Sequence, residues 1–396
     1  MRNILFITST NLAANPRLVK ELRLAVSMGF SCTVIQFRLG NWSDVMTDTL
    51  ETEFSSVRFI RLSALRKPFL PWLVTTSLQK IFSILPTRLL SGYLLSVATG
   101  KRSALLQWQL KRLKQSFDWV IAHNPATFYP ALSFALKNRC KLGIDIEDYH
   151  PGETLDDSMG AQMRKLMCLV LPKADYCSYA APLIAEAVRK DIPNMQNIQL
   201  VLMNGFPADE FVMPQTKSTQ CLKLVWYSQH IDYGRGLENV LKVADQLHEV
   251  VELHLIGNLQ SAFANTFLHG KRGVVIHPPM HQKQLHRFLG DFDVGLALDI
   301  PLNPNRDIAL TNKIITYAQA GLIIAAMHTK GQDQFLDESG LAHIKMTNDE
   351  SSISKAFLEI FEMKTSSRFD PVKQYTLGLN YCWERISDPL KQQFIK

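Results

Sequence analysis

Short apolar runs alternate with helical patterns along most of the chain, an order that is typical of βαβ units with parallel sheets. In the first half, strands are expected at 4–8, 32–37, 57–62, 119–123, 142–146, 176–179 and 199–203. In the second half, they are expected at 222–227, 252–256, 274–277, 294–298, 322–326 and 343–346. The pattern predicts an α/β protein with two doubly wound domains.

A polar stretch without periodicity, 207–222, separates the two halves and predicts a linker. The first domain is expected over 1–206 and the second over 223–374. The tail, 375–396, carries a further helical pattern. A chain of 396 residues is too long for one ordinary core, which agrees with this division.

The composition is that of an ordinary globular protein, with 46% hydrophobic and 20% charged residues, and it excludes disorder as a description of the whole chain. The six cysteines form no Cys-x-x-Cys pair and no zinc-ligand spacing. The first apolar run is too short for a secretory signal. These features predict a cytoplasmic protein with reduced thiols.

The net charge of +7 is concentrated in one segment. Residues 54–117 contain eleven Lys and Arg side chains, from Arg58 to Lys114, and no acidic residue. Within 58–114, leucines and aromatic residues lie between these cations, which suits amphipathic helices on the anionic inner face of a membrane. A basic outer face on ordinary domain helices is the alternative. No nucleic-acid-binding motif accompanies the charge, so nucleic acid is not an expected partner.

The segment 310–321 has the features of a helix start that binds an anion. Thr311 or Asn312 can cap the helix, and no Glu or Gln three residues after Thr311 closes a capping box. The remaining first-turn N–H groups, the helix dipole and Lys313 are then available to a phosphate.

A second candidate anion site follows the first strand of the second half. Gly234 and Gly236 flank Arg235 in a turn that leads into a helix, beyond the carboxyl end of a parallel strand. The guanidinium fork of arginine matches a diphosphate. Further along, Gly257 and Asn258 form a turn where the backbone can approach a base or ribose closely. Plain surface turns are the alternative interpretation of both segments.

The first half carries polar candidates at two strand ends. Asn15 is expected to cap a helix that starts with Pro16, and it places Arg17 near the strand end. After the strand at 142–146, an acidic cluster with one histidine follows, which consists of Asp145, Glu147, Asp148, His150 and Glu153. A carboxylate there could bind sugar hydroxyls or accept a proton from an acceptor. A solvated acidic loop is the alternative.

Four segments, 15–22, 143–153, 226–238 and 310–321, resemble motifs of bacterial family 4 glycosyltransferases of the GT-B fold. The resemblance implies two Rossmann-like domains that face a central cleft, with a C-terminal helix crossing back to the N-terminal domain. It implies catalytic roles for Glu147, Asp148 and His150, and acceptor or cleft roles for Asn15 and Arg17. It implies donor contacts from Ser228, Arg235, Gly236, Gly257, Asn258, Thr311, Asn312, Lys313 and Tyr317.

The implied function is sugar transfer from a nucleotide-diphosphate donor to a lipid-linked or polysaccharide acceptor in cell-surface glycan biosynthesis, with retention at the anomeric carbon. Apart from the donor, no cofactor or metal is expected. The chain departs from the family at two positions, where Ile308 and Thr316 replace the usual glutamates, although Asp307 lies one residue away. A catalytically degenerate binding subunit and a nucleotide-sugar epimerase are therefore the alternatives.

Overall fold

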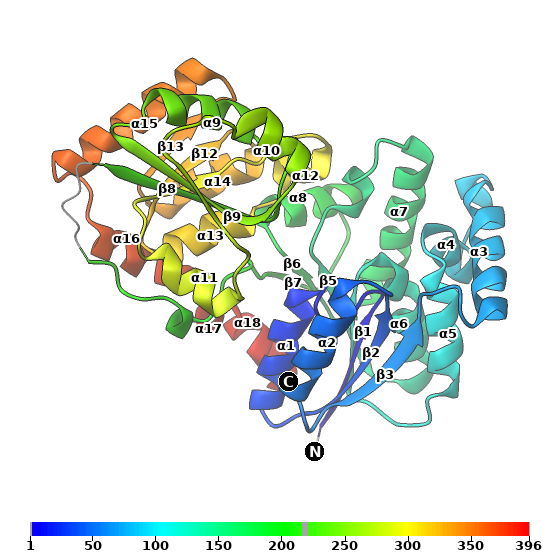
Figure 1. Cartoon of the computed structure of the whole chain (residues 1–396). Coiled ribbons are helices and arrows are strands. Elements are labelled where there is room, and N and C mark those ends of the chain that lie inside the picture. The colour runs from blue at the N-terminus through cyan, green and yellow to red at the C-terminus, as the bar shows by residue number, and fades with distance from the viewer. Residues whose placement is uncertain (1, 216–220, 396) are drawn as a thin grey trace. The chain divides into compact units, whose positions relative to one another are not determined.

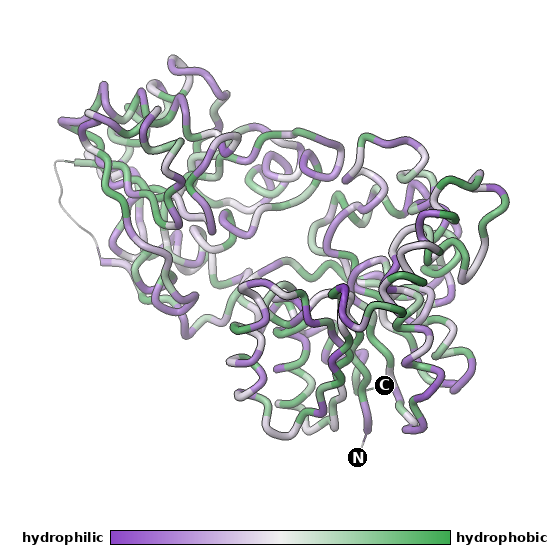
Figure 2. Tube along the Cα trace, turned by 45° about the vertical axis from the view of Figure 1, so that its right-hand side comes forward, coloured by the Kyte–Doolittle hydropathy of each residue, from purple (hydrophilic) through white to green (hydrophobic). Residues whose placement is uncertain are grey.

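The computed structural model describes residues 2–215 and 221–395 and divides the chain into two compact units (Figure 1). The first unit comprises Met1–Leu202 and Pro389–Lys396, and the second comprises Met203–Asp388. Part of the predicted linker, 216–220, lies outside the described residues. Figure 2 shows hydrophobic stretches (green) in both units. The strands in the middle of each sheet are mostly buried, as expected for parallel sheets covered by helices.

The sheet of the first unit has seven strands in the order β3-β2-β1-β4-β5-β6-β7, and all neighbouring pairs are parallel. The strands are β1 (Asn3–Thr8), β2 (Ser31–Arg38), β3 (Arg58–Ser63), β4 (Trp119–His123), β5 (Lys141–Ile146), β6 (Tyr176–Tyr179) and β7 (Ile198–Val201). The order reverses between β1 and β4, which makes the sheet doubly wound and sets a switch point at the carboxyl ends of these two strands.

The helices of the first unit connect these strands. They are α1 (Pro16–Ser27), α2 (Trp42–Thr52), α3 (Phe69–Ser83), η1 (Thr87–Leu89), α4 (Gly92–Thr99), α5 (Arg102–Arg112), α6 (Pro125–Asn138), η2 (His150–Gly152), α7 (Asp157–Val170), η3 (Leu171–Lys173) and α8 (Pro182–Asp191). The basic segment 58–114 thus begins with the edge strand β3 and continues as α3 to α5.

The sheet of the second unit has six parallel strands in the order β10-β9-β8-β11-β12-β13. They are β8 (Leu222–Ile231), β9 (Val251–Leu259), β10 (Val274–His277), β11 (Val294–Ala297), β12 (Ile323–Met327) and β13 (His343–Met346). The switch point lies between β8 and β11. A core of fully buried side chains, among them Leu224, Leu253 and Phe357, packs on the sheet.

The connecting segments of the second unit are mostly helical. They are η4 (Ala208–Glu210), α9 (Leu237–Gln246), α10 (Ser261–Phe267), α11 (Gln282–Leu289), α12 (Pro304–Ile308), α13 (Asn312–Gln319), α14 (Lys330–Ser339), α15 (Glu350–Thr365), α16 (Pro371–Gly378), η5 (Leu379–Tyr381) and α17 (Trp383–Ile386). No helix in 2–215 or 221–395 has both the length and the apolarity that a membrane span requires.

The tail forms several short helices rather than one. α16 and α17 belong to the second unit, whereas Pro389–Lys396, with most of α18 (Asp388–Ile395), clusters with the first. There the Phe394 carbonyl accepts a hydrogen bond of 2.9 Å from Arg2, and its ring lies 6.3 Å from that of Trp119. The chain therefore returns to the unit in which it began.

Candidate functional site

At the switch point of the second unit, the loop that follows β8 contacts the loop that follows β11. Gly236 precedes α9 with a positive φ of 75°, which glycine adopts without strain. A Cβ at this position would lie 2.8 Å from the Leu298 carbonyl oxygen, beyond the end of β11. Arg235, one residue earlier, is exposed and forms no ion pair with any described residue. The predicted arginine therefore stands where ligands bind in open α/β sheets.

The start of α13 adjoins the same loop. Thr311 occupies the N-cap position, but its side chain makes no capping hydrogen bond, so the first-turn N–H groups lack a side-chain cap. Lys313 Nζ lies 3.9 Å from Asp299 Oδ2 and 5.9 Å from the centre of the Trp226 ring. Gly236 thus lies against Leu298, and Lys313 lies near the next residue, Asp299. The turn before α9 and the start of α13 therefore meet at the same loop. Asn312, between Thr311 and Lys313, is exposed.

The interior face of α13 is closed. Tyr317 is fully buried, its hydroxyl donates to the Leu296 carbonyl at 3.3 Å, and its ring occupies the space left by the missing side chain of Gly295. In this structure Tyr317 therefore supports α13 from the core and has no surface for a donor. Thr316 is also fully buried; it accepts from the Tyr227 hydroxyl at 3.0 Å and donates to the Asn312 carbonyl at 2.8 Å.

The carboxylate beside Ile308 has a structural role. Asp307 accepts a 3.1 Å hydrogen bond from the backbone N–H of Lys330, and it pairs with Lys330 Nζ at 2.6 Å. Partial burial raises the pKa of Asp307, but these bonds to Lys330 outweigh burial and lower it. Asp307 thus holds the first residue of α14, and Ile308 is half-buried.

Three other predicted donor residues lie together at the ends of β8 and β9. A Cβ on Gly257, which has a φ of 152°, would overlap the carbonyl oxygen of Ser228. Asn258 is exposed and donates to the Gln229 carbonyl at 3.0 Å. The close approach of the two strands therefore requires glycine at position 257.

The switch point of the first unit is formed by Thr8, Asn15 and Asn124. Asn15 caps α1 by accepting from the Leu18 N–H at 3.0 Å, and it donates to Thr8 Oγ1 at 3.3 Å. Thr8 in turn donates to Asn124 Oδ1 at 2.8 Å. Asn15 is buried, so its amide joins the start of α1 to the end of β1, and Thr8 continues this network to Asn124 after β4.

Arg17 is the centre of a buried ion pair. Its guanidinium donates to both oxygens of Asp145, at 2.8 and 2.5 Å, and to the Leu202 carbonyl at 2.7 Å. Ser178 donates to the same carboxylate at 2.7 Å. Burial alone would raise the pKa of Asp145, but Arg17 holds it well below its usual range. Arg17 is 3% exposed, which makes it a structural cation beneath the sheet edge rather than an accessible acceptor contact.

Two further members of this network were not predicted from the sequence. His123 at the end of β4 places Nε2 3.4 Å from Glu21 and Nδ1 3.3 Å from Asp145. These three residues are close enough to hold a metal ion. However, the imidazole directs one nitrogen to each carboxylate, and Arg17 already neutralises Asp145. A bridging imidazolium therefore fits the geometry better than a metal ion.

The surroundings of His123 predict a loss of stability in alkaline solution. Burial lowers the pKa of His123, but Glu21 and Asp145 outweigh burial and raise it from 6.5 to about 9. Because the folded protein holds this proton more tightly, the proton contributes about 3 kcal/mol of stability. This contribution is complete below pH 6.5 and is lost as the pH rises through about 9. Denaturant unfolding across this range should show the decline, and His123→Gln should flatten it. Equal slopes in both proteins would contradict the assignment.

The acidic loop after β5 contains the remaining candidates. Glu147 is half-buried, and burial raises its pKa despite the nearby Arg17. The half-buried Asp148 accepts a 2.9 Å backbone hydrogen bond from His150. His150 is buried, and its Nδ1 lies 2.7 Å from Glu153. The structure therefore ties His150 to Glu153 and places Glu147 beside the buried network.

Comparison with known proteins identifies the fold. No model of a protein family matches the chain, and no curated protein matches it in sequence. Solved structures do match over the full length. A glycosyltransferase from Rickettsia africae has a TM-score of 0.67 at 12% identity, covering 100% of this chain and 99% of that one. The Anabaena HepE protein, solved with UDP and glucose, has a TM-score of 0.65 at 12% identity, with 100% of both chains covered.

Sucrose-phosphate synthase from Thermosynechococcus elongatus is similar to the same degree, with a TM-score of 0.65 at 12% identity and coverage of 100% and 98%. These neighbours share the two parallel-sheet, Rossmann-like units described above. The chain therefore has the GT-B fold of glycosyltransferases. At this level of identity the similarity establishes the architecture, and the chemistry has to be argued from the residues.

Proposed function

We propose that this protein is a glycosyltransferase that transfers a sugar from a nucleotide-diphosphate donor. The observation that carries the proposal is the meeting of Gly236 and Lys313 at Leu298 and Asp299. This places an exposed arginine and a helix start with a lysine at one switch point. A diphosphate is the donor group that such an arrangement suits best, because it offers oxygens to backbone N–H groups, to an ammonium and to a guanidinium fork.

On the donor side, Arg235, Lys313 and the start of α13 with Thr311 and Asn312 would bind the diphosphate. As the sugar leaves, negative charge develops on the diphosphate, and fixed cations stabilise that charge without reorganising. Ser228, Gly257 and Asn258 would line the nucleoside end. Protein cations thus supply the stabilisation, and the proposal requires no metal.

On the acceptor side, Glu147 is the best candidate to receive the proton of the acceptor hydroxyl. Burial raises the pKa of Glu147, which makes its carboxylate a better proton acceptor than an exposed glutamate. Asp148 would orient sugar hydroxyls, and His150 would hold the loop through Glu153. We propose a lipid-linked or polysaccharide acceptor, retention at the anomeric carbon, and a place on the anionic inner face of the cytoplasmic membrane.

Thr316 motivates a second candidate function. The resemblance implies a glutamate at this position, where Thr316 instead binds Tyr227 and leaves no carboxylate. A protein that binds the donor without transferring the sugar, as a partner subunit, would fit this substitution. A third candidate, an epimerase, would convert the donor without any acceptor.

A donor screen separates these candidates. The purified protein is incubated with a panel of nucleotide-diphosphate sugars, with and without vesicles that carry a lipid-linked sugar, while nucleotide release and sugar products are followed. Sugar transfer that Glu147→Gln abolishes, with donor binding retained, is the expected result. Donor binding without turnover on any acceptor favours the partner subunit, and a changed sugar from the donor alone favours the epimerase. Absence of nucleotide binding across the panel would overturn the proposal.

A further inference from the structure

Helix α3 exposes apolar side chains along its length. Phe69 is 57% exposed, Leu70 is 71% exposed and Ile81 is 53% exposed, and Ile84, directly after the helix, is 82% exposed. Thr75 is the one residue of this 15-residue helix that is buried. These apolar side chains are therefore exposed to water, although their burial in an apolar environment would be energetically favourable.

These exposed residues lie on one face. At 3.6 residues per turn, the exposed positions of α3 and its C-cap fall within an arc of about 140°. They are Phe69, Leu70, Leu73, Val74, Ser77, Lys80, Ile81 and Ile84. Six of the eight are large and apolar. The outward face of α3 is therefore the apolar one, the reverse of a usual surface helix.

The inward face of α3 is fixed to the unit. Figure 1 shows α3 at the outer edge of the first unit, with α4 beside it. Trp72 lies on this side, and its ring contacts Arg66 and Lys101 at 5.3 and 5.6 Å. Lys101, directly before α5, also donates to the Thr76 hydroxyl of α3 at 3.4 Å. The helix is thus held in place while its apolar face points outward.

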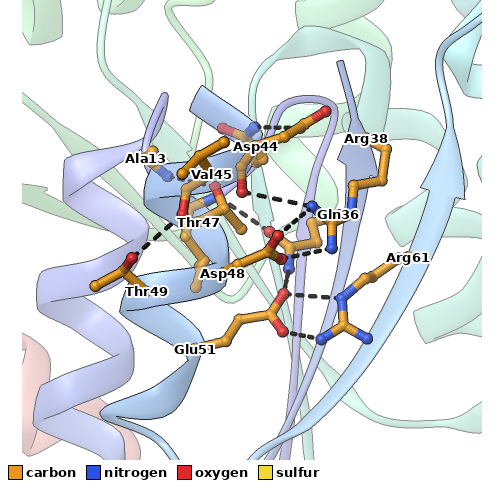
Figure 3. A network of polar contacts seen from close by, with 12 residues as sticks. Ala13, Gln36, Arg38, Asp44, Val45, Thr47, Asp48, Thr49, Glu51 and Arg61 are labelled. Carbon is orange, nitrogen blue, oxygen red and sulfur yellow. Dashed lines mark hydrogen bonds and ion pairs between the residues drawn. The ribbon is translucent and has the colours of Figure 1, made fainter. Parts of the chain in front are cut away.

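Cations surround this face, and most of them lack ionic partners. Figure 3 shows that Arg61, on β3, is paired with Glu51 of α2, so that its charge is neutralised. By contrast, the exposed Arg66, Lys67, Lys80 and Arg88 form no ion pair with any residue of the described chain. Residues 54–117 contain no acid. The apolar face therefore lies in a field of uncompensated positive charge.

We infer that α3 docks the protein on an anionic lipid surface, with its apolar face in the interface and its axis along the membrane plane. Apolar side chains with basic neighbours match acyl chains below anionic headgroups. A second copy of this chain is a poor match, because two such faces would bring like charges together. With 15 residues, α3 is shorter than a bilayer-spanning helix.

Helix α7 connects the carboxyl end of α3 to the candidate acceptor loop. Gln162 of α7 donates to the Ser83 carbonyl at the end of α3, at 3.1 Å, and Lys165 donates to Thr87 at 2.8 Å. α7 in turn packs on η2, where a Cβ at Gly160 would lie 3.1 Å from the Pro151 carbonyl oxygen. Docking would thus present 147–153 to lipid-linked acceptors. This last step rests on the proposed sugar transfer. Docking itself, which assigns the proposed membrane location to one helix, rests on α3 and the cations around it.

Vesicle binding tests the inference with the full chain. The variant carries four substitutions, Phe69→Ser, Leu70→Ser, Val74→Ser and Ile81→Ser, which remove apolar surface and leave the charge unchanged. The wild type should sediment with vesicles of phosphatidylcholine and phosphatidylglycerol, and the variant should bind them at least roughly tenfold more weakly. A matched control replaces exposed apolar residues elsewhere, Val45→Ser, Leu136→Ser, Leu302→Ser and Leu358→Ser, and should bind as the wild type does.

Two results would overturn the inference. One is equal binding by the α3 variant and the wild type. The other is self-association of the wild type in solution that the α3 variant abolishes, which would assign this face to a second copy. Titration of the α3 variant with a nucleotide diphosphate keeps the two proposals apart. If the α3 variant keeps its nucleotide affinity but no longer binds vesicles, the docking inference is supported. If the wild type itself does not bind nucleotide, the proposed sugar transfer is contradicted and the docking inference is not affected.

Discussion

Replacing Arg17 by methionine should lower the free energy of unfolding of the first unit by about 3–5 kcal/mol. The substitution keeps much of the side-chain volume but removes the charge that neutralises Asp145. Asp145 is 2% exposed, and Glu21 and Glu147 lie in the same network, so three carboxylates would remain with His123 as their cation. Removing one partner of a buried ion pair leaves the other charge without solvation. The resulting loss of folding free energy is far larger than the net stability that the pair contributes.

Hydrogen exchange, measured by mass spectrometry on peptides that cover β4 and β5, reports this loss within the first unit. Arg23→Met is the matched control, because Arg23 pairs with Glu53 on the surface, where both side chains are nearly half exposed. That control should cost no more than about 1 kcal/mol. Adding Asp145→Leu to Arg17→Met should restore part of the lost stability, since it removes the isolated charge. An effect of Arg17→Met as small as that of the control would contradict the role of the network.

Much of the fold could be predicted from the sequence because parallel strands are buried on both faces. Each apolar run expected to be a strand corresponds to one of the strands β1 to β13. The largest discrepancies are at the carboxyl ends of β8 and β9, which continue to Ile231 and Leu259. The extra residues of β8 follow an irregular pairing with β9 between Tyr227 and His230, which residue pattern alone does not reveal. Strand order depends on contacts between distant segments, and the sequence pattern contains no information on them.

The candidate site could be predicted only where function depends on local structure. Lys313 and Arg235 were recognisable because a helix start and a glycine turn are set by a few consecutive residues. Glu21 was missed because it looks like any charged residue of α1, and only the packing of α1 against β4 brings it to His123. Tyr317 is fully buried because its ring packs over Gly295 of β11, a contact between distant segments that the residues of α13 do not reveal.

Arg235→Ala and Lys313→Ala should each weaken binding of a nucleoside diphosphate by about 10- to 100-fold, because a charge-assisted hydrogen bond contributes about 1.5–3 kcal/mol. Binding of the corresponding nucleoside should change little, since neither side chain is proposed to contact the base or ribose. Arg235→Lys should fall between the wild type and Arg235→Ala, because it keeps the charge but loses the bidentate fork. Isothermal titration calorimetry with both ligands measures the difference directly.

Arg272→Ala provides the control for a general loss of positive charge. Arg272 lies in the second unit, is 66% exposed and is 3.7 Å from Asp245, so its removal changes the net charge equally without touching the proposed site. The affinity of the Arg272→Ala variant for the nucleoside diphosphate should stay within about twofold of the wild type, since exposed charges are screened by salt over roughly 10 Å. Equal losses of nucleoside and diphosphate affinity in the Arg235 and Lys313 variants would contradict the phosphate assignment. Selective loss of diphosphate affinity would instead place the donor phosphates at Arg235 and Lys313, on the two loops that meet at this switch point.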